Sequence, residues 1–245
     1  MPFAILSFSY LYVRSSILTD YCLKLPLLLN DNSLLAATNI GERTSTVFSM
    51  LLVYLKLLFF QIKLSWEYSY NTFSIVSITN IKLLISHALH LALLAIAIKG
   101  LREKKLISFA ILFYFTSMLI TSNLFVLIAS SFGERFLFTP SLGFCIAVPV
   151  LLSRLLKTDL KIIHTSSSKV LISLFVLIYF TYGYKTITRN EDWRNNMSLY
   201  KSGILTSPNS ARAHYIYAAE IVANIEADNN IPDKDKMIKT ALSEY

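Results

Sequence analysis

IKLLISHALHLALLAIAI (residues 81–98) and LISFAILFYFTSMLITSNLFVLI (residues 106–128) are nearly uninterrupted apolar stretches. Each approaches or exceeds the ~20 residues that a helix needs to cross ~30 Å of hydrocarbon. A soluble protein would instead alternate apolar and polar residues along each of its elements. The two stretches therefore predict helices that span a membrane.

Two further apolar stretches, residues 137–153 and residues 169–187, predict additional spans on the C-terminal side. The first of them contains Pro140 and Pro149. Membrane helices tolerate proline because packed neighbours satisfy the backbone groups that it leaves unbonded. We therefore expect both stretches to cross the membrane.

On the N-terminal side, residues 44–60 are strongly apolar but contain Lys56. Such a segment either spans the membrane or lies flat at its interface, with the Lys56 ammonium group reaching toward water. The loop that follows, residues 61–80, carries Trp66 and several tyrosines. These residues suit the headgroup layer, where an aromatic ring is half wet.

The composition of the whole chain supports this reading. Of its 245 residues, 54% are hydrophobic and 16% are charged, and the mean hydropathy is +0.53. Soluble domains are roughly 25% charged. The net charge of +8 does not predict nucleic-acid binding, because the aromatic motifs of RNA-binding modules are absent and the basic residues gather in short loops. The predicted fold is an all-α, multi-spanning bundle.

The distribution of Lys and Arg predicts the orientation. Loops 99–105 and 154–169 each hold four basic residues, whereas loop 129–136 holds Arg135 alone. Basic loops remain on the cytoplasmic side. We therefore expect loop 129–136 and the C-terminal tail to lie on the non-cytoplasmic side.

The tail differs in character from the rest of the chain. Residues 188–245 are polar, and two helical stretches are predicted at about 192–206 and 209–227, with a third beginning near Asp233. We therefore divide the chain into a membrane domain, residues 1–187, and a tail, residues 188–245.

Three segments resemble the transmembrane and tetratricopeptide-repeat family. GERFLFTPSLGFC, residues 133–145, resembles its ER(Y/F)LYxPSxGFC signature, and residues 31–71 resemble its conserved loop region. That loop departs from the family pattern at Ser33, where proline is usual, and at Glu67, where aspartate is usual. PNSARAHYIYAAEI, residues 208–221, resembles the first helix of a tetratricopeptide repeat.

The resemblance implies a protein O-mannosyltransferase of the multi-spanning glycosyltransferase class. Its donor would be a polyprenyl-phosphate-linked sugar, and its tail would bind a protein partner or acceptor. The early outer loop that carries the family's catalytic acidic residues has no counterpart here, so we expect a part of a longer protein that is inactive alone. An integral protein of the bacterial inner membrane or the endoplasmic reticulum is implied. The alternative is a non-enzymatic membrane-anchored scaffold.

Five residues are candidates for a lipid-phosphate or substrate site. Glu134 and Arg135 lie at an outer membrane edge, where charges are costly and tend to be functional or paired. Arg135 could hold a lipid phosphate through two parallel hydrogen bonds, or form a structural ion pair. Glu67, Tyr68 and Tyr70 could line a sugar groove, or anchor the loop at the interface. No catalytic residue is assigned.

No metal site is predicted. His87 and His90 share one face of residues 81–98, but that segment offers no Asp, Glu or Cys to complete a ligand set. Polar packing inside the bundle is the preferred interpretation of both histidines.

Overall fold

The protein is described from a computed structural model that covers residues 2–18, 26–61, 63–157, 166–227 and 234–244. These residues form helices and loops and contain no strand. The predicted all-α class is confirmed. The elements, in chain order, are α1 (Pro2–Leu18), η1 (Ser33–Ala36), α2 (Ile40–Phe59), α3 (Ile81–Leu101), α4 (Leu106–Thr121), η2 (Glu134–Leu137), α5 (Phe138–Leu155), α6 (Ser166–Asp192), α7 (Asn196–Thr206), α8 (Ala211–Ala227) and α9 (Lys234–Glu244).

Three of the described helical segments are long and apolar enough to cross a membrane: α3, Glu134–Leu155 and Ser168–Asp192. Helix α4 is apolar but shorter. Together with the relatives reported below, these segments identify an integral membrane protein. Most of α6 is exposed, as expected for a helix whose apolar surface faces lipid.

Two helices end elsewhere than predicted. The predicted span 106–128 is too long, because α4 stops at Thr121 and Asn123 adopts a left-handed backbone with φ 59°. That conformation cannot continue a right-handed helix. In contrast, α6 continues past residue 187 to Asp192, so one helix crosses the proposed division between membrane domain and tail.

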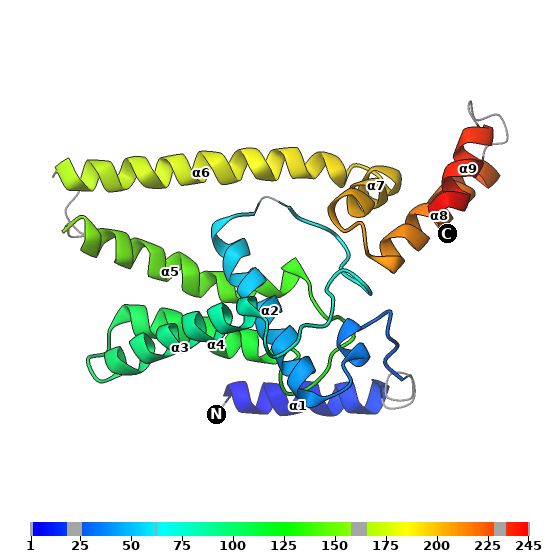
Figure 1. The fold of residues 1–245 in the computed structure, drawn as a ribbon. Helices are drawn as coiled ribbons and strands as arrows, with labels where there is room; N and C mark the ends of the chain where they lie inside the picture. The colour runs from blue at the N-terminus through cyan, green and yellow to red at the C-terminus, as the bar shows by residue number, and fades with distance from the viewer. Residues whose placement is uncertain (1, 19–25, 62, 158–165, 228–233, 245) are drawn as a thin grey trace.

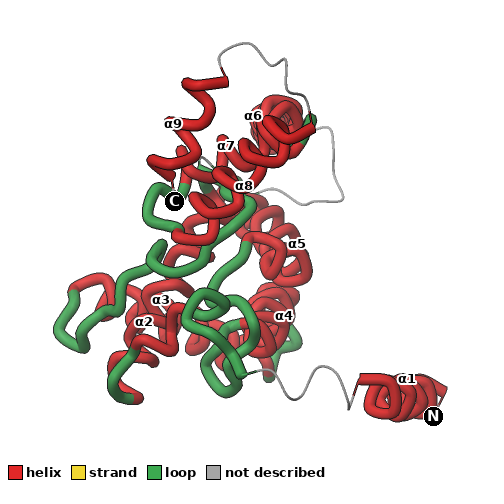
Figure 2. Tube along the Cα trace, turned by 90° about the vertical axis from the view of Figure 1, so that its right-hand side faces the viewer, coloured by secondary structure: helices red, strands yellow, loops and turns green. Residues whose placement is uncertain are grey.

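Helices α4, α5 and α6 run in roughly the same direction, and α2 runs across them (Figure 1). Helices α4, α5 and α6 are seen nearly end-on in Figure 2. This direction of α2 favours the interfacial alternative for residues 44–60. The turn between α3 and α4 lies at the same end of the molecule as the end of α5 and the start of α6, whereas η2 and the tail lie toward the other end (Figure 1).

Small residues let α4 and α5 approach closely. A side chain at Gly143 would meet the backbone oxygen of Ala110 and the backbone nitrogen of Tyr114. Helices in membranes associate through such small-residue contacts, because apolar burial gives little advantage over lipid. Gly143 therefore determines how closely α5 packs against α4.

The core lies where α2 packs against α4 and the segment 132–137. Tyr54 is buried there and stacks on Phe132, with ring centroids 4.1 Å apart. Its hydroxyl accepts from the backbone N–H of Gly133 at 3.0 Å and donates to the Gly133 carbonyl at 3.3 Å. Tyr54 therefore fixes the backbone directly before Glu134 and Arg135.

His87 and His90 pack against α2, in line with the preferred interpretation. The ring of His87 stacks on Phe48 with centroids 3.9 Å apart, and His90 Nδ1 is 2.7 Å from the Ser86 carbonyl. No group of three or more metal-ligating side chains occurs in the described parts of the chain.

Candidate functional site

A small polar pocket lies where the aromatic loop, residues 63–80, meets η2 and the end of α6. It encloses about 160 Å³. Four of the five candidate residues from the sequence line it: Glu67, Tyr68, Glu134 and Arg135. The rest of its lining is mainly aromatic or small: Ser65, Trp66, Ser130, Phe132, Gly133 and Trp193.

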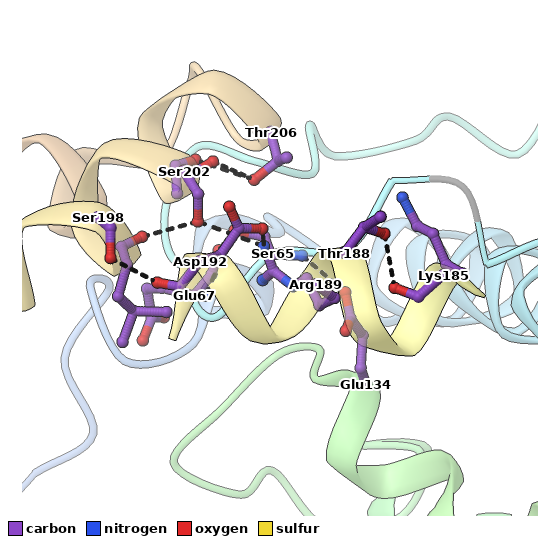
Figure 3. Close-up of polar contacts among 12 residues, drawn as sticks. Ser65, Glu67, Glu134, Lys185, Thr188, Arg189, Asp192, Ser198, Ser202 and Thr206 are labelled. Carbon is purple, nitrogen blue, oxygen red and sulfur yellow. Dashed lines mark hydrogen bonds and ion pairs between the residues drawn. The ribbon is translucent and has the colours of Figure 1, made fainter. Parts of the chain in front are cut away.

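Glu134 is held by the aromatic loop. Its carboxylate accepts from the backbone N–H of Ser65 at 2.7 Å and from the Tyr68 hydroxyl. Figure 3 shows Glu134 pointing from η2 toward Ser65, with Arg189 of α6 near the same cluster. Both donors share Oε1 of the carboxylate, and no ion pair joins Glu134 to Arg135 among the described residues.

Tyr68 is a donor that keeps its proton. Burial of the ring raises the pKa of the Tyr68 hydroxyl, and its hydrogen bond to Glu134 raises the pKa further. The phenol therefore stays neutral at physiological pH and goes on donating to the carboxylate. Its oxygen also accepts from the Ser65 backbone N–H at 3.0 Å, which ties three groups into one unit.

Arg135 is exposed, and its guanidinium lies over the Phe136 ring at 5.1 Å from the centroid. It lines the polar pocket and also an adjoining pocket of about 290 Å³, walled mainly by apolar residues that include Leu57, Leu137 and Phe138. No acidic side chain among the described residues is paired with it. The guanidinium therefore lies where a polar space and an apolar space meet.

The remaining two candidates have different positions. The Glu67 side chain accepts from the Tyr68 backbone N–H at 3.1 Å, so it stabilises its own loop at the rim of the pocket. Tyr70 is absent from the lining of the pocket and meets the tail instead, because its carbonyl accepts from the Ala211 N–H at 2.6 Å.

The aromatic loop also holds the tail. Asn71 N–H donates to the Asn209 carbonyl at 2.8 Å, and the hydroxyls of Ser69 and Ser210 are 2.9 Å apart. Trp66 packs on Gly203, where any side chain would strike the indole. The same loop thus contacts the carboxylate of Glu134 on one side and the tail on the other.

Sequence reasoning missed two residues of this region, Ser65 and Arg189. Ser65 acts through its backbone N–H, which any residue type provides, so no sequence signal identifies it. Arg189 lies on α6, bonds Asp192 at 2.5 Å, and enters the region because α6 continues beyond the apolar stretch. The polar residues 188–193, which end in Trp193, could have indicated that Arg189 lies near the site.

Comparison with known proteins finds curated relatives that carry the name protein O-mannosyl-transferase. The chain is 34% identical over 122 residues to Protein O-mannosyl-transferase TMTC1 of Homo sapiens, which is 50% of this chain and 13% of the relative. It is 28% identical over 159 residues to Protein O-mannosyl-transferase F38B6.6 of Caenorhabditis elegans, 65% of this chain and 22% of the relative. It is 38% identical over 91 residues to Protein O-mannosyl-transferase tmtc2 of Xenopus laevis, 37% of this chain and 10% of the relative.

The chain thus spans less than a quarter of the length of each of these relatives. No family model matches it, and no solved structure is similar to it. The matches at 26–39% identity nevertheless agree with the resemblance carried by residues 133–145. The resemblance to the transmembrane and tetratricopeptide-repeat family is therefore confirmed, and the curated homologues of this chain are protein O-mannosyl-transferases of that family.

Proposed function

We propose that this chain is part of a membrane glycosyltransferase that moves a sugar, mannose by the names of its relatives, from a polyprenyl-phosphate carrier to a hydroxyl group of a protein. The observation that carries the proposal is the position of Arg135. Its exposed guanidinium lies between a polar pocket with two tryptophans and a mainly apolar pocket.

The two pockets match the two parts of such a carrier. An isoprenoid chain suits the apolar walls of Leu57, Leu137 and Phe138. A sugar suits the polar pocket, where Trp66 and Trp193 provide flat apolar faces. The phosphate between chain and sugar would then lie beside Arg135, whose planar fork offers two parallel donors to two oxygens.

In the reaction, the acceptor hydroxyl oxygen bonds to the anomeric carbon, and the bond from that carbon to the phosphate oxygen breaks. A carboxylate takes the hydroxyl proton, and the phosphate leaves with the electron pair. Glu134 is a positioning residue in this scheme, because the Ser65 N–H and the Tyr68 hydroxyl both donate to its Oε1 and hold the carboxylate against the aromatic loop. Arg135 stabilises the negative charge on the leaving phosphate.

The tail is proposed to begin a tetratricopeptide array that binds the protein acceptor or another protein. From residue 211 to residue 244, α8 and α9 cover one length close to the ~34 residues of such a repeat. The two helices pack through Tyr217, Ile221 and Ala241. Entry of the tail into the non-cytoplasmic space, in the endoplasmic reticulum or outside a bacterial inner membrane, is part of this proposal.

The test uses the full-length protein and measures binding and turnover of a polyprenyl-phosphate sugar. Arg135→Lys keeps the charge but loses the fork, and it should lower both by about 5- to 150-fold, the range for one charge-assisted contact left unmade. Arg154→Lys is the matched control, since Arg154 is an exposed arginine at the opposite end of α5.

If Arg135→Lys and Arg135→Ala both bind and turn over the carrier as the parent does, the role of Arg135 is refuted. If the parent itself neither binds nor uses the carrier but retains a protein through its tail, the scaffold alternative replaces the proposal.

A further inference from the structure

A second, larger groove lies beside α2, lined by faces of that helix other than those at the Arg135 pockets. It encloses about 930 Å³ between α2, the end of the aromatic loop and α3. Ligand sites commonly measure about 300–1,000 Å³, so this groove lies at the upper end of that range. The proposed sugar-transfer site does not include it, because none of its lining residues also lines the two pockets at Arg135.

The groove has an apolar wall that continues along a membrane-spanning helix. Leu52 and Phe59 contribute from α2, and Leu89 and Leu93 contribute from α3. Helix α3 is one of the three segments long enough to cross the membrane. The wall therefore continues from α2 onto the apolar surface of α3.

The same groove has two basic side chains. Lys56 on α2 and Lys82 in the first turn of α3 both line it, and both are exposed. Neither ammonium group is paired with an acidic side chain in the described parts of the chain. Ser74, Ser77 and Asn80 add hydroxyl and amide groups along the rim. The groove is thus apolar on one wall and carries two positive charges.

We propose that this groove binds an anionic glycerophospholipid. Its phosphate would interact with Lys56 and Lys82, and its acyl chains would cover Leu89 and Leu93. The two lysines argue for an anionic headgroup over a zwitterionic one, because both line one groove without an acidic partner, and a lipid with a net negative charge neutralises them where a zwitterionic lipid does not. The volume of the groove, about 930 Å³ against about 290 Å³ for the apolar pocket at Arg135, argues for a two-chain lipid over the single isoprenoid chain assigned there.

The experiment is lipid retention by the purified full chain. The protein is reconstituted with equimolar phosphatidylglycerol and phosphatidylcholine, extracted in mild detergent, and the retained lipid is counted by native mass spectrometry. The parent should retain phosphatidylglycerol in preference to phosphatidylcholine. The double variant Lys56→Gln and Lys82→Gln should lower that preference by about tenfold or more. The control pair Lys99→Gln and Lys104→Gln should leave it unchanged.

Two results overturn the proposal: equal retention of both lipids by the parent, or an unchanged preference in the Lys56 and Lys82 variant. Displacement of phosphatidylglycerol by polyprenyl phosphate at equal concentration would also overturn it, by making the groove a carrier site. If the lysine variant does not fold, Leu89→Phe with Leu93→Phe fills the apolar wall and keeps both lysines. Undiminished phosphatidylglycerol retention in that variant would refute the site.

Discussion

Glu134 and Arg135 are neighbours in the chain, yet their side chains have different surroundings. Glu134 is bonded to the aromatic loop through Ser65 and Tyr68, while Arg135 is exposed at the edge of two pockets. The sequence marked both residues because charge at a membrane edge is rare. It could not separate their roles, because the partners of Glu134 are 66 and 69 residues away along the chain.

Removing the Tyr68 hydroxyl tests whether the Glu134 cluster is structural. Tyr68→Phe leaves the Glu134 carboxylate with the Ser65 N–H alone, and should destabilise the folded protein by about 1–3 kcal/mol. Thermal unfolding in detergent measures this. Tyr184→Phe, on the exposed surface of α6, is the matched control and should have little effect. Equal effects of the two substitutions on the unfolding temperature would show that the Tyr68–Glu134 hydrogen bond does not stabilise the protein.

His214 makes the packing of α9 depend on pH. Its Nδ1 pairs with Glu244 and its Nε2 lies 2.8 Å from the Pro208 carbonyl. Burial alone would lower the pKa of His214, but the hydrogen bonds to Glu244 and Pro208 outweigh it and raise the pKa above 6.5. The stabilisation is therefore complete below 6.5 and is lost as pH rises through the raised pKa.

The measurement is hydrogen exchange of α9 amides, corrected for the intrinsic effect of pH. Protection should decrease between mildly acidic and mildly alkaline pH in the parent, by less than about 1 kcal/mol because the pair is partly exposed. His214→Gln should show the lower protection at every pH. The same pH profile in parent and variant would show that another group is responsible.

Among the helices, the close contact of α4 with α5 depends on one glycine. Gly143→Leu would force a side chain into the Ala110 backbone and should destabilise the protein by about 1–3 kcal/mol. Gly183→Leu is the matched control, because nothing lies within 4 Å of the position of its added carbon. Unfolding midpoints in detergent compare the two. A Gly143 variant as stable as the Gly183 variant would show that the helices are not in contact.

The apolar pattern of the sequence predicted the presence of the helices better than it predicted their first and last residues. Helix α2 begins where Asn39 caps it, with its side chain accepting from Glu42 N–H, earlier than the apolar pattern begins. Helix α4 ends early because the Asn123 side chain accepts from Ile128 N–H and donates to the Ser130 carbonyl. The Asn123 side chain also accepts from the side-chain amide of Asn32, 91 residues away, and the apolar residues 124–128 hide these contacts from any periodicity argument.

The folding of the tail depends on its contacts with the aromatic loop. The three helices α7, α8 and α9 amount to little more than one repeat, which cannot bury its apolar face without neighbours, so an isolated peptide of residues 193–245 should show no cooperative melting by circular dichroism. Within the full chain, α7 and α8 should resist proteolysis. Trp66→Ala should remove that resistance, because it removes the contact between the indole and Gly203 of α7. A sharp two-state transition of a monomeric peptide would contradict this dependence.

For the molecule as a whole, the orientation inferred from the basic loops stays a prediction, and the arrangement of the helix ends shows how to test it. The two basic loops border helix ends that lie at one end of the structure, and η2, which carries Arg135, lies toward the other (Figure 1). Cysteines placed singly at Ala129 and Lys104, both exposed, test which end faces outward once Cys22 and Cys145 are replaced by serine.

An impermeant thiol reagent added from outside should label position 129 and spare position 104, because basic loops remain cytoplasmic. Permeabilised membranes should label both, which controls for access. Labelling of 104 alone in intact membranes would reverse the orientation and move the Arg135 pocket to the cytoplasmic side.

The pairing of the aromatic loop with the start of α8 has a consequence for any polypeptide that the tail holds. Because Asn71 and Tyr70 bond the backbone at Asn209 and Ala211, the tail leaves the membrane domain at a fixed point. The start of α8 then keeps a constant distance from the aromatic loop and from Arg135 beside it. If the tail binds a polypeptide as proposed, that polypeptide would present the same part of its length to the Arg135 pocket each time, at a distance set from the Asn71–Asn209 bond.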